Sequence, residues 1–223
     1  GCTLAGVDLM NRPRVLVADD HRIVAEGLRG LLEPDFELVE VVADGRQLLE
    51  AAGRHVPDVI LADISMPSLN GLDALDQLRK KGCRAKVVFL TMHNDSTYAK
   101  RAMKSGASGF VLKHSAPEEL IIAIREALVG RTYVAKSIAE SLQLTSGARP
   151  NSSDSEAPIL TPRQREVIQL VAEGKTAKEI GSILRISMRT AENHKARIMR
   201  LIGASTTAEL IRFAMRHGII SSD

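Results

Sequence analysis

The sequence predicts two domains, an α/β domain built on a parallel sheet and a smaller all-α domain. Short apolar runs alternate with stretches of helical periodicity up to about residue 129, which is the pattern of repeated β-α units. A segment rich in Gly, Ser, Pro and Asn interrupts every apolar period at residues 145–158. Only helical patterns follow that segment, so the two domains belong to different fold classes.

Five apolar runs of the first part are expected to be buried strands. Each run is apolar on both faces, as a strand of a helix-covered parallel sheet is. Helical stretches lie between the runs, and the last helix is expected at residues 117–129. Five β-α units predict a five-stranded parallel, doubly wound, flavodoxin-like sheet with helices on both faces. The runs are residues 15–18, 38–42, 59–62, 87–90 and 110–112.

Local composition sets the expected domain boundaries. Residues 145–158, TSGARPNSSDSEAP, have the composition of a flexible linker. We expect the α/β domain at residues 13–133, the linker at 134–158 and the helical domain at 159–223. Residues 1–12 are expected to be an unstructured leader, because Met10 almost directly precedes the first strand-like run and reads as a natural start.

Overall composition excludes several classes of function. The 223 residues carry a net charge of +3, with 44% hydrophobic and 3% aromatic residues. No apolar run approaches the ~20 residues that cross a bilayer, so a membrane protein is excluded and a cytoplasmic one is expected. Two cysteines are too few for a disulfide scaffold. The absence of Trp argues against a stacking platform for single-stranded nucleic acid.

The helical tail is basic, whereas the rest of the chain is mildly acidic. Residues 159–223 hold 11 Lys and Arg against 6 Asp and Glu, and residues 1–158 hold 19 against 21. The net charges are therefore +5 and −2. This distribution favours a polyanionic partner for the tail. Solvated helix faces would produce the same excess of positive charge, so the charge alone does not predict a polyanionic partner without a supporting motif.

Three capping boxes mark helix starts in the tail. In each box, a Thr and a Gln or Glu three residues later satisfy each other's backbone donors. Together with Gly174 and Gly203 as C-terminal caps, the boxes predict four helices. Residues 176–184 and 187–202 then form a helix-turn-helix, the plan in which the second helix enters the major groove of DNA. The boxes begin at Thr161, Thr176 and Thr206.

Polar residues follow four of the five strand-like runs: Asp19 and Asp20 the first, Asp63 the third, Thr91 the fourth and Lys113 the fifth. Carboxyl ends of parallel strands converge on one crevice, so these groups should meet. Three close carboxylates need a cation, and oxygen ligands select Mg2+ or Mn2+. Such a site suits phosphoryl transfer to a carboxylate. Each residue alone has a simpler interpretation, such as Asp20 capping a helix, but the set favours a shared site.

Four segments resemble the receiver domain of two-component response regulators: VLVADDH, DVILADISMPSLNGLDAL, VVFLTMH and GASGFVLK. Their order and spacing match over residues 13–130. The resemblance implies that Asp63 accepts a phosphoryl group from a partner histidine kinase. It also implies a Mg2+ ion held by Asp20 and Asp63 directly, by Asp19 mainly through water, and by the backbone carbonyl of Ser65.

The same resemblance assigns roles to three residues at the ends of the later strands. Thr91 and Lys113 would bind the phosphoryl oxygens. Phe110 has the position of the switch aromatic, but it lacks a hydroxyl, so switching would depend on packing alone.

The second helix of the helix-turn-helix carries the expected DNA contacts. Its buried stripe is expected to be Ala191, Ile198, Leu201 and Ile202, and polar residues follow helical spacing on the other side. Asn193 and Glu192 come early in the helix, where base edges are reached, and arginines can meet phosphates. The expected DNA-contacting residues are Arg189, Glu192, Asn193, Ala196, Arg197 and Arg200, with Lys178 and Lys195 as further contacts.

From Leu160 to about His217 the tail resembles the LuxR-type DNA-binding domain, through the stretch LTPRQREVIQLVAEGKTAKEIGSILRISMRTAENHKARIMRLIG. A receiver, a linker and this domain together resemble response regulators of the NarL/FixJ subfamily. Members pair on DNA through the last helix, here about residues 205–216. The apolar residues of that helix serve either the pairing interface or the bundle core; they are Leu210, Ile211, Phe213 and Ala214.

The expected function is that of a transcription factor controlled by phosphorylation of Asp63. Its expected partners are a histidine kinase, double-stranded promoter DNA and a second copy of the chain on DNA, with RNA polymerase as a further candidate. The rival class is a Mg-dependent aspartyl-phosphate phosphatase. Such enzymes of the haloacid dehalogenase type need Asp-x-Asp, but Asp63 is followed by Ile64-Ser65, so we expect no enzyme. A third alternative is an orphan regulator that binds DNA without phosphorylation.

Overall fold

Six short strands form one parallel sheet in the first part of the chain. The computed structural model describes residues 12–92, 96–115, 117–140, 158 and 160–220. The strand order is β2-β1-β3-β4-β5-β6, and every neighbouring pair is parallel. The strands are β1 (Arg14–Ala18), β2 (Glu37–Val42), β3 (Val59–Asp63), β4 (Lys86–Thr91), β5 (Gly109–Leu112) and β6 (Tyr133–Val134).

The sixth strand corrects the expected number of five. In β6, Tyr133 pairs with Gly109 and Val134 with Phe110, at the edge of the sheet. Two residues are too few to show an alternating pattern, so the periodicity of the sequence does not predict this strand. Val134 and the helical residues 136–140 occupy the start of the segment expected to be the linker. Most of that segment, residues 141–157, lies outside the described residues, as do residues 1–11 of the expected leader.

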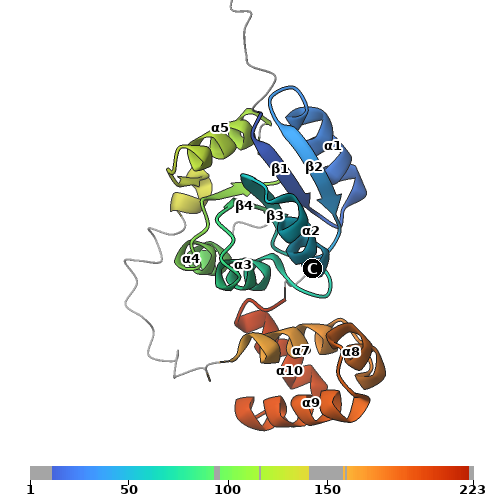
Figure 1. The fold of residues 1–223 in the computed structure, drawn as a ribbon. Helices are drawn as coiled ribbons and strands as arrows, with labels where there is room; N and C mark the ends of the chain where they lie inside the picture. The colour runs from blue at the N-terminus through green and yellow to red at the C-terminus, as the bar shows by residue number, and fades with distance from the viewer. Residues whose placement is uncertain (1–11, 93–95, 116, 141–157, 159, 221–223) are drawn as a thin grey trace, which may run out of the picture.

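Helices cover both faces of the sheet (Figure 1). On one face α1 and α5 bury the side chains of Val17, Leu61 and Val111, and on the other α2, α3 and α4 bury Leu16, Ile60 and Phe110. Both faces of each central strand are thus apolar, which explains the uninterrupted apolar runs. The helices are α1 (Arg22–Leu32), α2 (Gly45–His55), α3 (Gly71–Lys80), α4 (Ser96–Lys104) and α5 (Pro117–Leu128).

The tail folds into four helices around a separate apolar core, as expected. They are α7 (Pro162–Ala172), α8 (Ala177–Leu184), α9 (Met188–Ile202) and α10 (Thr207–Arg216). The capping boxes at Thr161, Thr176 and Thr206 all form, with reciprocal bonds to Gln164, Glu179 and Glu209. Gly203 ends α9 with a positive φ of 70°, a conformation that glycine adopts without a Cβ clash.

Two details of the tail core are decided by the structure. Leu210, Phe213 and Ala214 are buried in the bundle, so they serve the core. Leu201 was expected in the buried stripe of α9, but it is 44% exposed, and this expectation is wrong. Ala191 and Ile198 are seven residues apart and point into the core, whereas Leu201 follows Ile198 by three residues and lies toward the polar side.

Candidate functional site

The first candidate site lies where the carboxyl ends of β1 and β3 meet. The strand order reverses between these neighbours, since β1 is followed by β2 on one side and the chain then continues in β3 on the other. Such a reversal opens a crevice for ligands at the carboxyl edge of the sheet. Asp19 and Asp20 follow β1, and Asp63 is the last residue of β3.

The structure brings three expected carboxylates together and adds a histidine. Ligand atoms of Asp19, Asp20, His21 and Asp63 all lie within 4.8 Å of one another. His21 Nδ1 is 3.2 Å from Asp19 Oδ1 and 3.1 Å from Asp20 Oδ1. Sequence reasoning did not name His21 as a site residue, although its place directly after the acidic pair is a usable signal. Asp20 does not cap α1, because the N-cap position belongs to His21.

Lys113 provides the positive charge of the site. Its Nζ lies 2.7 Å from Asp63 Oδ2 and 2.8 Å from Asp19 Oδ2, and its side chain is 3% exposed. Lys113 directly follows β5, and its backbone N–H donates to Thr91 O at the end of β4. Strands β4 and β5 thus position the Lys113 ammonium beside Asp19, which follows β1, and Asp63, which ends β3.

Burial and charge shift the protonation of this pair. Burial raises the pKa of Asp63, and the hydrogen bond from Lys113 opposes that rise without cancelling it. For Lys113, burial alone would lower the pKa, but its bonds to Asp19 and Asp63 outweigh burial and raise it. Lys113 therefore stays charged. The ionised form of Asp63 is disfavoured, because burial destabilises its negative charge more than Lys113 stabilises it.

Of the remaining expected residues, Thr91 at the end of β4 and Ser65 just after β3 lie beside the crevice, and Phe110 lies behind it. Thr91 ends β4 and is buried, and Ser65 donates its backbone N–H to Asp63 Oδ1 at 3.2 Å. Phe110 is fully buried, with its ring centroid 6.4 Å from that of Phe89. Its ring contributes to the core behind the site and does not reach the crevice surface.

The donor set fits a hard divalent cation. Asp19, Asp20 and Asp63 offer oxygen atoms from two neighbouring strands, within the spread that one ion spans. Carboxylate oxygens favour Mg2+ or Mn2+ over softer metals, and an ion would supply the charge that Lys113 alone does not. A backbone carbonyl of the loop after β3 would complete such a set.

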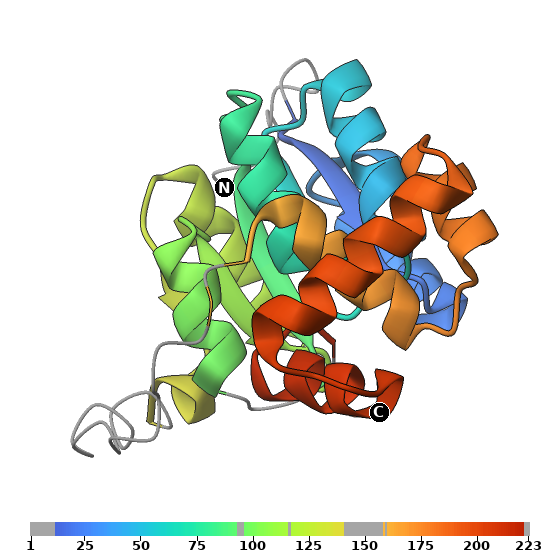
Figure 2. The ribbon, with the colours of Figure 1, turned by 90° about the horizontal axis from the view of Figure 1, so that it is seen from below.

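The second candidate site is the outer face of α9. The six residues expected on it are all exposed, and α9 lies on the side of the tail domain away from the sheet (Figure 1). Seen from below, α9 crosses the front of the molecule (Figure 2). Lys178 on α8 is exposed, while Lys195 donates to Thr207 Oγ1 at 3.1 Å and is half-buried. The residues are Arg189, Glu192, Asn193, Ala196, Arg197 and Arg200.

A polar interface between the two domains was not predicted from the sequence. Asp73 of α3 is 1% exposed and pairs with Arg101 of α4 and with Arg165 of α7, whose Nε is 2.6 Å away. Glu166 of α7 pairs with Arg46 of α2 at 3.0 Å. The outer face of α7 thus docks on the helices and loops around the first site.

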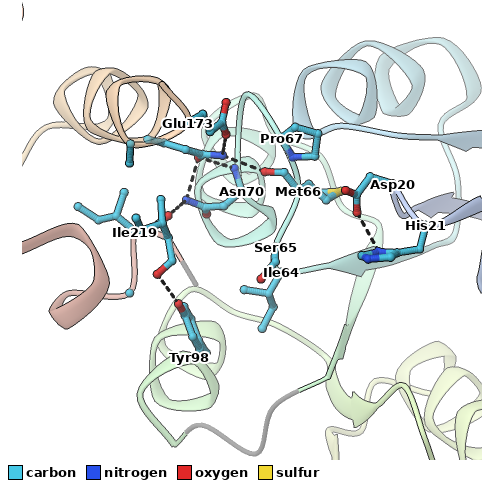
Figure 3. Close-up of a pocket in the computed structure, with 14 residues that line it drawn as sticks. Asp20, His21, Ile64, Ser65, Met66, Pro67, Asn70, Tyr98, Glu173 and Ile219 are labelled. Atoms are coloured by element: carbon cyan, nitrogen blue, oxygen red, sulfur yellow. Dashed lines mark hydrogen bonds and ion pairs between the residues drawn. The ribbon is translucent and has the colours of Figure 1, made fainter. Parts of the chain in front are cut away.

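The interface also borders a partly open cavity beside the acidic cluster. It has a volume of about 390 Å³ and lies between the loop after β3, the end of α7 and the residues that follow α10 (Figure 3). One side of the cavity is lined by Asp20, His21 and Ser65, and the other side by Gln169 and Glu173. The crevice of the first site therefore opens toward the docked domain.

Comparison with known proteins identifies the class. The family model described as response regulator receiver domain matches residues 15–125, and that described as bacterial regulatory proteins, luxR family, matches residues 158–214. The chain belongs to the DNA-binding response regulators of two-component systems that join these two domains. The resemblance seen in the sequence is thereby confirmed.

Full-length relatives agree with this class. The transcriptional regulatory protein MctR of Rhizobium johnstonii is 36% identical over 211 residues, covering 93% of this chain and 95% of that protein. The oxygen regulatory protein NreC of Staphylococcus aureus is 33% identical, covering 93% of this chain and 99% of that protein. Both names describe regulators of gene expression or of a physiological response.

Solved structures share the fold. A LuxR-family response regulator from Aurantimonas sp. SI85-9A1 matches with a TM-score of 0.59 and 33% identity, covering 62% of this chain and all of that one. RcsB dimers bound to DNA match with a TM-score of 0.59 and 26% identity, covering 91% of this chain and 98% of that one.

Within the described residues, no helix is long and apolar enough to cross a membrane.

Proposed function

We propose that this response regulator accepts a phosphoryl group on Asp63 and that phosphorylation controls its action as a transcription factor. The observation that carries the proposal is the buried Asp63, which lies within 4.8 Å of two more acids and 2.7 Å from Lys113. A carboxylate with poorly compensated charge at a ligand crevice is suited to attack phosphorus. A partner histidine kinase is the proposed donor.

Each residue of the first site has a distinct proposed task. Asp63 attacks the phosphorus of the donor and becomes the acyl phosphate, while the donor nitrogen leaves. Asp19, Asp20, Asp63 and the Ser65 carbonyl would hold Mg2+ or Mn2+, which supplies neutralising charge when bound. Lys113, already beside Asp63 Oδ2, shifts its hydrogen bond to a phosphoryl oxygen.

Thr91 and Phe110 are the proposed route from the site to the rest of the molecule. Thr91 at the end of β4 binds a phosphoryl oxygen, and Phe110 on the neighbouring strand repacks against Phe89. Because the interior is close-packed, such repacking moves α4, which follows β4. The contacts of α4 with the tail domain are then altered, and the tendency of the chain to dimerise changes with them.

The proposed output is sequence-specific binding to double-stranded promoter DNA by α9. Its exposed arginines contact phosphates, and Glu192 and Asn193 contact base edges. The chain acts as a homodimer on DNA, as the solved RcsB dimers on DNA do. RNA polymerase is a further proposed partner.

The proposed DNA-binding domain is residues 159–223. The proposed receiver domain begins at residue 13 and extends beyond 133, because Val134 pairs with Phe110 in the sheet and Ile138 is buried in its core. The proposed site of action is cytoplasmic.

The phosphatase alternative is disfavoured by the residue that would act as its acid. The position two residues after Asp63 is occupied by Ser65, whose backbone N–H bonds to Asp63 and whose hydroxyl is no acid near neutral pH. We therefore propose no multiple-turnover enzymatic activity. An orphan regulator is disfavoured because the acids and Lys113 are gathered as phosphorylation requires.

Intact-mass measurement tests the site assignment. Incubation with Mg2+ and acetyl phosphate should add one phosphoryl group to the wild-type chain. Asp63→Asn should abolish the adduct, whereas Asp35→Asn on the surface should retain it. A full adduct on the Asp63→Asn protein would overturn the assignment.

A further inference from the structure

The ring of His21 turns a nitrogen toward the acidic cluster. Its Nδ1 lies 3.2 Å from Asp19 Oδ1, 3.1 Å from Asp20 Oδ1 and 3.9 Å from Asp63 Oδ2. Figure 3 shows the ring directed at Asp20. An imidazole nitrogen thus lies among the oxygen atoms that would hold an ion.

The turn between β1 and α1 fixes the position of this ring. His21 N donates to Asp19 Oδ1 at 2.9 Å, so the backbone of His21 is tied to the same oxygen that its ring faces. His21 is the N-cap residue of α1, but its side chain makes no capping bond, so helix capping does not account for the position of the ring. The side chain is 59% exposed, which lets an ion approach the ring from solvent.

Lys113 and His21 approach the cluster through different oxygens of Asp19. The ammonium lies 2.8 Å from Oδ2, whereas the ring nitrogen lies 3.2 Å from Oδ1. Asp20 Oδ1 lies on the same side as the ring. Of the three oxygens that His21 faces, only Asp63 Oδ2 is also paired with Lys113. An ion bound beside His21 is therefore compatible with the ion pair between Lys113 and Asp19.

The spacing of these atoms fits the coordination shell of one ion. Ligand atoms about 2.1 Å from an octahedral ion lie about 3.0 Å apart in adjacent positions and about 4.2 Å apart in opposite ones. The distances from Nδ1 to Asp19 and Asp20 match adjacent positions, and the distance to Asp63 is close to that of opposite ones. A hydrogen bond from the ring to a carboxylate gives a similar spacing, but such a ring would not change which ion the site prefers.

An imidazole ligand changes the preference of a carboxylate site among divalent ions. Mg2+ keeps oxygen ligands and water, so it gains little from a nearby nitrogen. Imidazole suits first-row transition ions, whose affinity for a given site rises from Mn2+ through Fe2+ to Co2+. The selectivity of the cluster therefore depends on whether His21 joins the carboxylates as a ligand.

We propose that His21 is a fourth side-chain ligand of this site, beside Asp19, Asp20 and Asp63, and that it shifts the preference of the site from Mg2+ toward first-row transition ions such as Fe2+ and Co2+. The inference rests on the proposed function, since it takes the acidic cluster as the metal site. His21 would thereby decide which ion accompanies the phosphoryl acceptor.

The test measures Mg2+ and Co2+ affinities by calorimetry in the full chain, for the wild type, His21→Ala and His55→Ala. His55 Nε2 lies 2.8 Å from Glu40 Oε2, outside the cluster, so it is the matched control of a histidine beside a carboxylate. His21→Ala should lower the ratio of Co2+ affinity to Mg2+ affinity about tenfold, as even disturbed partners of metal ligands do at metal sites. The visible absorption of bound Co2+ should change with it, because a nitrogen donor is lost. His55→Ala should match the wild type in ratio and spectrum.

An unchanged affinity ratio in His21→Ala, or an equal loss in His55→Ala, would overturn the assignment of His21 and leave the carboxylate site standing. A wild-type chain that binds neither ion would overturn both the inference and the proposed metal site. If His21→Ala does not fold, His21→Gln replaces it, and the same outcomes decide. The measurement uses no phosphodonor, so a failure of Asp63 to become phosphorylated remains a separate result.

Discussion

Lys113 Nζ lies 2.7 Å from Asp63 Oδ2, so the proposed phosphoryl acceptor is ion-paired before any reaction. That pairing does not fully offset burial, and the pKa of Asp63 stays above its usual range. A carboxyl whose pKa is higher folded than unfolded contributes stability below the unfolded pKa. That contribution is lost as the pH rises through the folded pKa. Ionised Asp63 therefore destabilises the metal-free fold near neutral pH.

Asp63→Asn should accordingly raise the thermal midpoint of the metal-free protein by a few degrees at pH 7, because it removes a buried charge. The gain should shrink toward about pH 4, the ordinary pKa of an unfolded Asp, because the raised pKa of folded Asp63 leaves the wild-type carboxyl protonated above that pH. Excess Mg2+ should narrow the difference, since a cation stabilises the ionised form. Calorimetry at both pH values checks this, and a lower midpoint for the variant at pH 7 without metal would contradict it.

The outer face of α9 should separate base reading from phosphate contact. Asn193→Ala or Glu192→Ala should change the selected DNA sequence, each costing about 1–3 kcal/mol of discrimination. Arg197→Ala and Arg200→Ala should weaken binding to all sequences alike and reduce its salt dependence. Arg84→Ala, exposed on the receiver, is the control. An unchanged motif and affinity for Asn193→Ala would exclude that residue as a reader.

Met92 should lengthen the lifetime of the phosphorylated state. It follows Thr91 directly and is 57% exposed, so it is not packed beneath α4. From there its side chain can cover the acyl phosphate and exclude the attacking water. Met92→Ala should shorten the lifetime several-fold, equivalent to roughly 1 kcal/mol of barrier. Autodephosphorylation at equal Mg2+ measures it, with the exposed Met188→Ala as control, and an equal or longer lifetime for Met92→Ala rejects shielding.

The crevice of the first candidate site was predictable because strand order alone brings its parts together. Asp19, Asp63 and Lys113 each follow an apolar run, and the carboxyl ends of parallel strands share one edge. The two-residue strand β6 was missed because it is too short for a periodic signal. Leu201 was misplaced because an apolar residue beside a buried stripe looks the same in sequence whether it faces the core or solvent.

The docking of the two domains had no such signal. Arg165, Gln169 and Glu173 form a polar helix face that reads as solvated, and only the folded chain shows that Gln169 is buried against Asn70. Contacts between distant polar residues follow no short-range spacing. They depend on how one finished domain lies on another, which periodicity and capping do not specify.

Fluorescence anisotropy with a selected duplex DNA tests the central claim most directly. Wild-type protein treated with Mg2+ and acetyl phosphate should bind at least about tenfold more tightly than untreated protein, a change of about 1.4 kcal/mol. Asp63→Asn should show no increase under the same treatment. A wild-type chain that carries the adduct but binds DNA unchanged, or an equal increase in Asp63→Asn, would contradict control of DNA binding by phosphorylation of Asp63.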